Sequence, residues 1–306
     1  MRIAITGATG TLGQALAREL AGRGDELTAL SRDPAKARRL LGADIDAASW
    51  PRPKDEPPPA DALAGRDAVV HLLGETIAQR WNDDVKREIR DSRVLSTRML
   101  VNALASLPDA ERPRVLVSQS ATGHYGSRGP ERLAEDAPAG HDFLAEVVVA
   151  WEAEALRAEE HGVRVVLTRT GVVLSPGGGA LEKMLPFFKL GIGGPVAGGH
   201  QCVPWVHQDD VVGAFVHCLD TDAASGPVNV VAPEPATNAE LSKALGRVLK
   251  RPAFAPVPGF AIKALYGEMA TIVTTGQCAV PARLEEQGYR FRRPELEAAL
   301  RDATGR

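Results

Sequence analysis

Three glycines near the start of the chain have the spacing and setting of a dinucleotide-binding turn. Gly7, Gly10 and Gly13 are spaced three apart, directly after an apolar run at 2–6 and at the start of a helical pattern. The first glycine of such a unit permits a tight turn, the second lets the backbone approach a pyrophosphate, and the third lets helix and strand pack closely. Amides at the positive end of the helix then point at phosphate. An empty strand–helix turn is the alternative, and we predict a dinucleotide site at Gly7, Thr9, Gly10, Thr11, Leu12 and Gly13.

The end of the second predicted strand favours one dinucleotide over the other. The strand at 26–30 is followed by Ser31 and Arg32, about twenty residues after the glycine motif, where NAD-binding folds carry an acid for the ribose 2′-hydroxyl. An arginine there accommodates a 2′-phosphate instead, and Ser31 adds a hydroxyl donor. We therefore predict NADP as the cofactor. The alternative is that Arg32 is one more solvated base in a run with Lys36, Arg38 and Arg39.

The elements that position these residues alternate between strand and helix. Near-continuous apolar strand cores separated by helices indicate a parallel sheet covered on both faces. We predict an α/β fold, a Rossmann-type doubly wound parallel sheet, with strands at 2–6, 26–30, 67–73, 114–118, 163–168 and 228–231 and helices at 14–23, 85–104, 143–158 and 211–219.

Two stretches interrupt this alternation. The Pro- and Asp-rich residues 42–62 are predicted to form a surface excursion. From about residue 233, helices at 238–249 and 260–272 flank an extended piece at 254–257, which predicts a smaller, mainly helical region. We predict two domains: an NADP-binding domain formed by 1–174 plus 205–232, and a smaller substrate or C-terminal domain formed by 175–204 plus 233–306.

Composition excludes several classes of protein. The chain has 306 residues, 44% of them hydrophobic, and a formal net charge of -3, so nothing suggests a nucleic-acid partner or a membrane-spanning protein. The N-terminus does not read as a signal peptide. Cys202, Cys218 and Cys278 are expected to be isolated thiols, which predicts a reducing, cytoplasmic location. The expected partner is a small-molecule substrate, and a homodimer is compatible with the sequence.

Longer motifs resemble a known family. The segments are GATGTLG at 7–13, SATGHYG at 120–126, RTGVVLSPGGG at 169–179 and PARLEEQGYRF at 281–291. They resemble the extended short-chain dehydrogenases/reductases, and more narrowly the atypical subgroup called "sugar-nucleotide epimerase" or "epimerase family protein", which carries a C-terminal domain of unknown function. The resemblance covers nearly the whole chain. It implies a nucleotide cofactor and, by analogy of fold, a sugar nucleotide as substrate.

The catalytic pair of that superfamily is missing from this sequence. The superfamily uses a Tyr-x-x-x-Lys pair, in which the lysine and the cofactor lower the pKa of the tyrosine, together with a serine and an asparagine. None of the three tyrosines precedes a lysine at this spacing. Alignment on the family places Leu144 and Val148 at the pair, Ser120 at the serine and Arg93 at the asparagine.

Several residues are candidates for the remaining chemistry. We predict Ser120 and Tyr125 as catalytic residues; the alternatives are a serine that satisfies backbone groups and an aromatic that closes the pocket. His124 and Glu146 are further candidate bases, and the glycine-rich stretch 191–199 is the expected substrate contact. The other predicted cofactor contacts are Leu72, Leu73, Gly74, Glu88, Arg93 and Val173.

The stretch 205–210 contains histidine and aspartate but lacks the spacing of a three-ligand zinc site, so we predict no metal and expect an aspartate to cap the helix at 211–219.

Two functions remain open. The first is an NADP(H)-dependent oxidoreductase or epimerase-like enzyme acting on a small carbonyl or hydroxyl compound. The second is a non-catalytic NADP(H)-binding redox sensor or regulatory partner.

Overall fold

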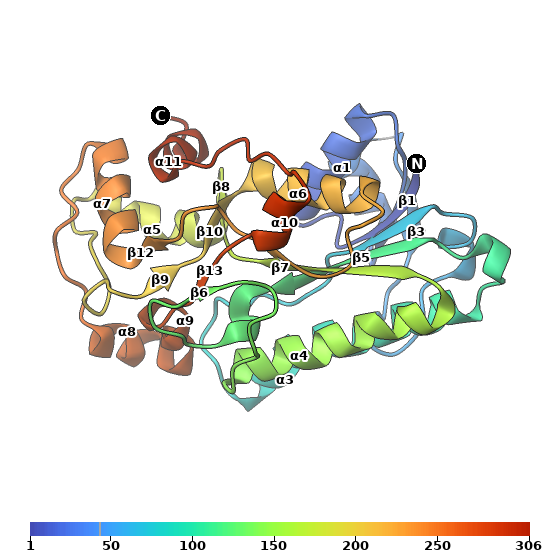
Figure 1. Cartoon of the computed structure of the whole chain (residues 1–306), viewed down its shortest axis with the longest axis horizontal. Coiled ribbons are helices and arrows are strands. Elements are labelled where there is room, and N and C mark those ends of the chain that lie inside the picture. Colours follow the sequence, from blue (N-terminus) through green and yellow to red (C-terminus); the bar gives the residue numbers. More distant parts are fainter. Residues whose placement is uncertain (43) are drawn as a thin grey trace.

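Seven parallel strands form one sheet in the order β3-β2-β1-β4-β5-β7-β11 (Figure 1). The computed structural model describes residues 1–42 and 44–306. The chain reverses its direction of strand addition between β1 and β4, which is where ligands bind in open α/β sheets. The predicted Rossmann-type doubly wound fold is confirmed. The strands are β1 Arg2–Thr6, β2 Glu26–Ser31, β3 Asp46–Ser49, β4 Ala68–His71, β5 Val115–Ala121, β7 Arg164–Thr170 and β11 Gly226–Val230.

Helices cover both faces of this sheet, as Figure 1 shows. On one face, Ile3 and Ile5 pack into a core with α1 Thr11–Gly22, α2 Pro34–Leu41 and α6 Gln208–Asp220. On the other face, Ala4 packs with α3 Asp83–Ser106 and α4 Phe143–Leu156. Because successive strand residues point to opposite faces and both faces are buried, the central strands are mostly apolar.

The prediction of a surface excursion at 42–62 is wrong in part. Residues 46–49 form β3 at the edge of the sheet, and Trp50 is buried directly after it. The strand has the sequence Asp-Ala-Ala-Ser, so it carries no apolar alternation that could reveal it. Residue 43 lies outside the described residues. The helix α2 was also not predicted, although Asp33 caps it and Pro34 occupies its first position.

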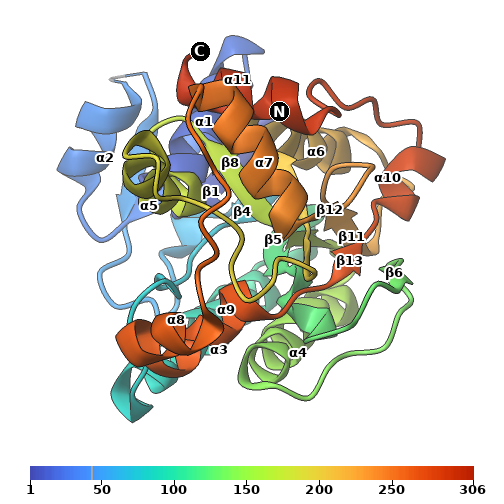
Figure 2. The same cartoon turned by 90° about the vertical axis from the view of Figure 1, so that its left-hand side faces the viewer.

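The C-terminal region lies at the carboxyl edge of the sheet, where Figure 2 shows α5 near α7, and α8 apart from them beside α9 and α3. It adds short strand pairs: β8 Val172–Ser175 with β10 Trp205–His207, β9 Cys202–Val203 with β12 Ala236–Thr237, and β13 Cys278–Ala279 with β6 Arg132–Leu133. Its helices are α5 Gly179–Lys189, α7 Asn238–Leu249, α8 Gly259–Tyr266, α9 Thr271–Thr274, α10 Ala282–Glu286 and α11 Leu296–Thr304. Short 3-10 helices complete the chain: η1 Ala60–Ala62, η2 Asp109–Glu111, η3 Thr122–Tyr125, η4 Arg157–His161 and η5 Gly267–Ala270.

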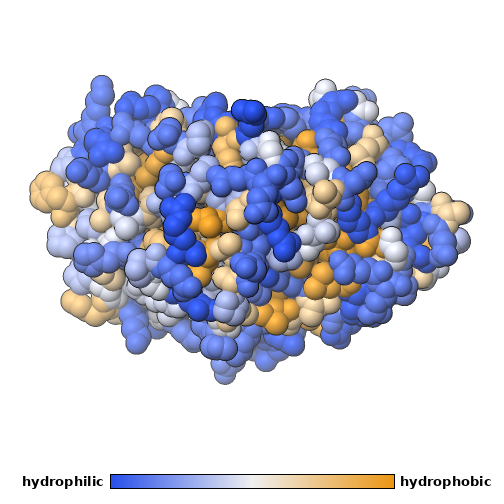
Figure 3. Space-filling view, in the orientation of Figure 1, coloured by the Kyte–Doolittle hydropathy of each residue, from blue (hydrophilic) through white to orange (hydrophobic). Residues whose placement is uncertain are grey.

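This region has its own apolar core, in which α5, α7 and α11 contribute Phe188, Leu245 and Leu300. The predicted helix at 260–272 is divided into α8, η5 and α9, with Gly267 at a positive φ of 64° where α8 ends. The two-domain division stays a prediction. Figure 3 shows apolar residues on the surface at this end of the molecule, where six large side chains are more than half exposed: Phe187, Leu190, Ile192, Phe254, Phe260 and Leu265.

The prediction of isolated cysteines is wrong for two of the three. Cys202 of β9 and Cys278 of β13 form a disulfide with a Cα–Cα distance of 5.2 Å, while Cys218 is free and buried. The two partners are 76 residues apart in sequence, so no local spacing could reveal the pair. Among residues 1–42 and 44–306, no helix is both long and apolar enough to cross a membrane.

Candidate functional site

The glycine turn after β1 is packed as tightly as its predicted role requires. Gly7 has a positive φ of 68°, and a Cβ on it would lie 2.8 Å from the carbonyl oxygen of Leu72. A Cβ on Gly13 would lie 2.3 Å from the carbonyl oxygen of Gly7. Gly10 differs, because an added Cβ would approach only the Gly7 oxygen, at 3.4 Å. Gly7 and Gly13 therefore serve packing, whereas Gly10 keeps the surface of the turn open to a ligand.

The start of α1 is free to receive an anion. Among the described residues, no side chain caps this helix, whose N-cap is Gly10, and its first turn contains no acidic residue. Thr11 is exposed, and Gly178 of the loop before α5 lies against it. The Thr9 carbonyl accepts a hydrogen bond from the Gln14 side chain at 2.8 Å, which fixes the turn. Free helix N–H groups together with the helix dipole favour a phosphate at this position.

The end of β2 places Arg32 beside this turn. Leu30 of β2 pairs with Thr6 of β1, which is the residue before Gly7. Arg32 follows Leu30 by two residues, so it leaves the sheet next to the glycine turn. The Arg32 side chain is exposed. The Ser31 hydroxyl is held in a local turn, in which it donates to the Asp33 carbonyl and accepts from the Asp33 amide at 3.1 Å.

A largely desolvated arginine lies at the neighbouring edge, after β4. A Cβ on Gly74 would lie 3.0 Å from the Arg93 guanidinium carbon, so the glycine makes room for the arginine. The guanidinium donates to the Ile89 carbonyl at 3.0 Å and lies 5.4 Å from the Trp151 ring centroid. Burial lowers the pKa of Arg93 to about 10. The arginine stays charged at neutral pH and supplies a cation at the point where the strand order reverses.

The other predicted cofactor contacts have different surroundings. Leu72 and Leu73 follow β4 and are half-buried. Val173 lies in β8 opposite Val206 of β10. Glu88 forms an ion pair with Lys54 at 2.7 Å, so its carboxylate already has a partner.

Below the carboxyl edge, Glu152 of α4 and Arg169 of β7 form a buried ion pair through two hydrogen bonds of 2.9 Å. The Ser120 hydroxyl donates to the same carboxylate at 2.5 Å, and the His124 Nδ1 lies 3.4 Å from it. Burial raises the pKa of Glu152, but the bonds from Arg169, His124 and Ser120 outweigh this effect and lower the pKa to about 2. The carboxylate is therefore ionised throughout the physiological range.

Tyr125 extends this network away from the surface. Its ring is fully buried, and its hydroxyl donates to the Asn229 side-chain oxygen at 2.7 Å and accepts from Arg169 at 3.2 Å. Burial raises the pKa of Tyr125, and the Arg169 charge only partly opposes this. The Asn229 amide group donates onward to the carbonyls of Leu133 and Val280. Tyr125 thus joins η3 to β11 and β7 beneath the sheet edge.

Leu144 and Val148, where the family resemblance places the catalytic pair, are apolar residues of α4. A Cβ on Gly123 would lie 3.7 Å from the Leu144 Cβ and 4.0 Å from a Val148 methyl, so η3 packs directly against both residues. The structure brings Ser120, His124 and Tyr125 together with Glu152 and Arg169, whereas Glu146 is exposed on α4. Sequence reasoning missed Glu152, Arg169 and Asn229. The available signal was a polar residue within a largely apolar element: Glu152 in the helix α4, Arg169 in the strand β7 and Asn229 in the strand β11.

The expected aspartate cap of the helix after residue 210 is wrong. The helix α6 begins at Gln208, and its cap is His207, whose Nδ1 accepts from the Asp209 amide at 3.2 Å. The buried Asp210 carboxylate instead accepts the backbone amides of Arg292 and Arg293 at 2.5 and 2.9 Å, which ties down the segment before α11.

One group of possible metal ligands occurs in this part of the molecule. The ligand atoms of His207, Asp209 and Asp302 lie within 4.8 Å of one another. The His207 Nε2 is 3.2 Å from the Asp302 carboxylate, so the arrangement also serves as an ordinary polar contact. The absence of a metal stays a prediction.

We expect Glu152→Gln to lower the free energy of unfolding by about 3–5 kcal/mol, because Arg169 would remain buried without a carboxylate. The matched control is Glu154→Gln on the same helix, where a half-buried carboxylate pairs with Arg98 and Arg157. Because exposure weakens these pairs, the control should lose less than about 1 kcal/mol. Urea unfolding at pH 7 measures both, and equal losses would contradict the central role of the Glu152 pair.

Comparisons with known proteins agree with this fold. The human epimerase family protein SDR39U1 is 38% identical over 99% of this chain and 99% of its own length. The crystal structure of that human protein (isoform 2) with NADPH matches with a TM-score of 0.89 and 36% identity, over 100% of this chain and 99% of that one. A nucleoside-diphosphate sugar epimerase from Corynebacterium glutamicum matches with a TM-score of 0.76 and 34% identity, over 98% of this chain and 57% of that one.

Two family models match adjoining parts of the chain. Residues 257–303 match a domain of unknown function, DUF1731, which agrees with the C-terminal domain implied by the sequence motifs. The larger match, over residues 3–231, includes the glycine turn, Arg93 and the Glu152–Arg169 pair. The chain belongs to the NAD dependent epimerase/dehydratase family.

Proposed function

We propose that this protein binds NADP(H) and transfers hydride to or from a small carbonyl or hydroxyl compound. The observation that carries the proposal is the open, uncapped glycine turn at Gly10, with Arg32 and Arg93 at the adjoining strand ends. Helix amides and two guanidinium groups suit a ligand with several phosphates. The resemblance to an NADPH-bound human structure supports the same ligand.

The preference for NADP over NAD rests on Arg32. A 2′-phosphate needs a cation where NAD-binding folds place a carboxylate, and the residue after Ser31 is an exposed arginine. When bound, the nicotinamide would accept or supply the hydride. The chain would bind the phosphates at the start of α1 and position the substrate above β5.

Ser120 is the proposed contact for the reacting oxygen of the substrate. Its proton is directed to the ionised Glu152 carboxylate at 2.5 Å, so its oxygen can accept a hydrogen bond from a substrate hydroxyl. We give Tyr125 no proton-transfer role, because its hydroxyl is already bonded to Asn229 and Arg169 in the interior. Leu144 and Val148 cannot exchange a proton, so the proton that accompanies hydride transfer would come from water or from the substrate.

The substrate class extends this proposal. The name of the Corynebacterium relative supports a sugar nucleotide. A non-catalytic NADP(H)-binding sensor is the second candidate, and the apolar Leu144 and Val148 beside Gly123 favour it. The small-molecule partner, the absence of a nucleic-acid partner, the homodimer and the cytoplasmic location stay predictions.

We expect Arg32→Asp to raise the Kd for NADPH at least about tenfold and to leave NADH binding equal or tighter, because it replaces the cation for a 2′-phosphate with an anion. The control is Arg39→Asp, an exposed base on α2 in the same basic run. Titration by NADPH fluorescence measures both variants. An unchanged Kd in Arg32→Asp would refute the assignment, and an equal loss in both variants would indicate only a general electrostatic effect.

We expect Gly10→Ala to fold with nearly normal stability but to bind NADPH at least about tenfold more weakly, because the added methyl occupies the ligand's approach to the turn. Gly13→Ala should lose stability, because its methyl would lie 2.3 Å from the Gly7 oxygen. Gly22→Ala, with open space around the added carbon, is the control for adding a methyl to α1. Thermal unfolding and NADPH titration together separate these outcomes, and tight NADPH binding by Gly10→Ala would contradict the proposed site.

The catalytic proposal is tested by incubating the protein with NADPH or NADP⁺ and a panel of carbonyl compounds, alcohols and sugar nucleotides while absorbance at the reduced nicotinamide band is followed. We expect turnover that Ser120→Ala lowers about tenfold or more through loss of a positioning bond, with the Kd for NADPH unchanged. Tyr125→Phe keeps its ring and should retain most of the turnover. Tight NADPH binding without turnover on the whole panel would favour the sensor.

A further inference from the structure

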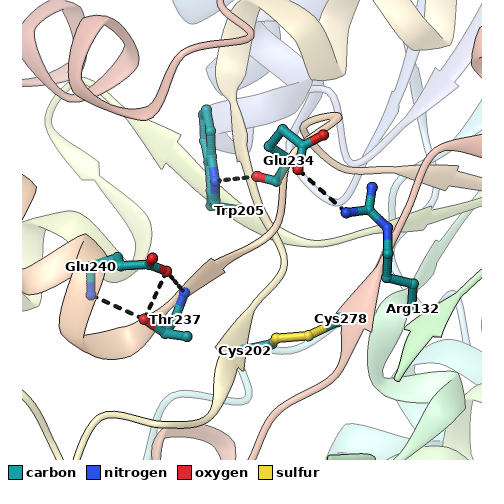
Figure 4. Close-up of a disulfide and its surroundings, with 7 residues drawn as sticks. All are labelled: Arg132, Cys202, Trp205, Glu234, Thr237, Glu240 and Cys278. Carbon is teal, nitrogen blue, oxygen red and sulfur yellow. Dashed lines mark hydrogen bonds and ion pairs between the residues drawn. A yellow bond between two sulfur atoms is a disulfide. The ribbon is translucent and has the colours of Figure 1, made fainter. Parts of the chain in front are cut away.

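The disulfide between Cys202 and Cys278 joins two segments that each contact an element next to the candidate site. Figure 4 shows the bond between β9 and β13. On the Cys202 side, the nearby Pro204 carbonyl accepts the Val172 amide at 2.7 Å, where β8 leaves the sheet. On the Cys278 side, the Gln277 side chain donates to the Thr122 hydroxyl at 3.2 Å, in the turn that follows Ser120. Through these two hydrogen bonds, the disulfide connects Val172, just after β7, to Thr122, just after β5.

The non-covalent contacts that parallel this bond are weak. Arg132 of β6 pairs with Glu234, just before β12, at 3.3 Å, and both side chains are more than half exposed (Figure 4). The Gln201 side chain donates to the Val273 carbonyl at 2.7 Å, in an exposed position. Exposed ion pairs and solvated hydrogen bonds contribute little to holding two segments together. The disulfide is therefore the strongest link between them.

The two cysteines differ in access. Cys202 is half-buried, whereas Cys278 is 5% exposed, so an external thiol would reach the Cys202 sulfur first. The third cysteine, Cys218, lies on the buried face of α6, and burial raises its pKa to about 12. A buried thiol of that kind does not take part in thiol–disulfide exchange near neutral pH, which makes Cys218 an internal reference.

We propose that Cys202 and Cys278 form a reversible redox site that exchanges with low-molecular-weight thiols and disulfides of the glutathione class and controls how tightly the two segments close over the candidate site. In reduction, an external thiolate attacks the Cys202 sulfur, the sulfur–sulfur bond breaks, and Cys278 leaves as a thiolate that takes a proton from water. A second external thiol then displaces Cys202, which gives two protein thiols and one external disulfide. Oxidation is the reverse, with the external disulfide as the two-electron acceptor.

The bond should govern the motion of the loop at 196–204 against the segment at 273–279. A Cβ on Gly276 would lie 1.9 Å from the Cys202 carbonyl oxygen, so the two backbones are in direct contact while the bond is closed. Without the bond, the two segments keep the hydrogen bond from Gln201 to Val273, and the neighbouring residues Arg132 and Glu234 keep their exposed ion pair, so local opening should become more frequent. Ligand exchange past these segments should then accelerate.

The first test uses the full-length protein in glutathione buffers that run from fully oxidised to fully reduced. After denaturation and alkylation, mass spectrometry should find one modified cysteine in the oxidised protein and three in the reduced protein, out of the three in the chain. Hydrogen exchange of the unliganded protein should be slower in 196–204 and in 273–279 for the oxidised form. Cys202→Ser and Cys278→Ser should both show the hydrogen exchange of the reduced form in every buffer. Cys218→Ala should follow the buffer as the unaltered protein does, with one modified cysteine fewer in each form.

The second test measures NADPH dissociation by stopped-flow fluorescence and rests on the proposed function. We expect a dissociation rate constant about threefold or more higher in the reduced form, and a value in Cys202→Ser that does not depend on the buffer. Three modified cysteines at every glutathione ratio would overturn the proposal, as would a bond that alters neither hydrogen exchange nor dissociation. If NADPH binds neither the oxidised nor the reduced form, the proposed function fails. The alkylation counts and the hydrogen-exchange rates still show whether Cys202 and Cys278 form a reversible redox site.

Discussion

The ion pair between Glu152 and Arg169 is the interaction on which the floor of the candidate site depends. Removing two charges from water costs several kcal/mol for each ion, and this cost is offset only where the remaining donors and acceptors are satisfied. Here Arg169 also donates to the Tyr125 hydroxyl and the Glu135 carbonyl, and Glu152 also accepts from Ser120. The pair can therefore form only when α4, β5, β7 and η3 are all in place. This requirement gives the site a single arrangement.

This dependence also accounts for the division between what the sequence predicted and what it did not. The parallel sheet was predictable, because strands buried on both faces must be apolar throughout and helices must separate them. The glycine turn was predictable because its spacing is local and Gly13 packs against Gly7 and Ala8 of the same strand–helix unit, although the close neighbour of Gly7 is Leu72 after β4. The short edge strand β3 was missed because only its position beside β2 makes Asp-Ala-Ala-Ser a strand.

The polar contacts were missed for a different reason, which is that their partners are distant in sequence. Tyr125 bonds to Asn229, Ser120 to Glu152, and Cys202 to Cys278, and none of these pairs has a characteristic spacing. Ser120 and Tyr125 could be identified as polar residues after a strand, but the direction in which their hydroxyls point depends on the fold. The sequence therefore indicated candidate residues, and the structure was needed to show that Tyr125 is bonded within the interior.

The residues that would bind the cofactor and the two positions where the resemblance places the catalytic pair belong to different elements of this fold. The glycine turn and Arg32 lie at the ends of β1 and β2, and Arg93 lies on α3, whereas Leu144 and Val148 lie on α4. In the proposed function, an apolar pair at those two positions leaves the proposed phosphate site in place. Across the site, the C-terminal region is joined to the turn after β5 by short strands, an exposed ion pair and one disulfide. In the proposed redox site, a covalent bond that can be broken sets the closure of these segments, while the surface that would bind the nucleotide belongs to the parallel sheet.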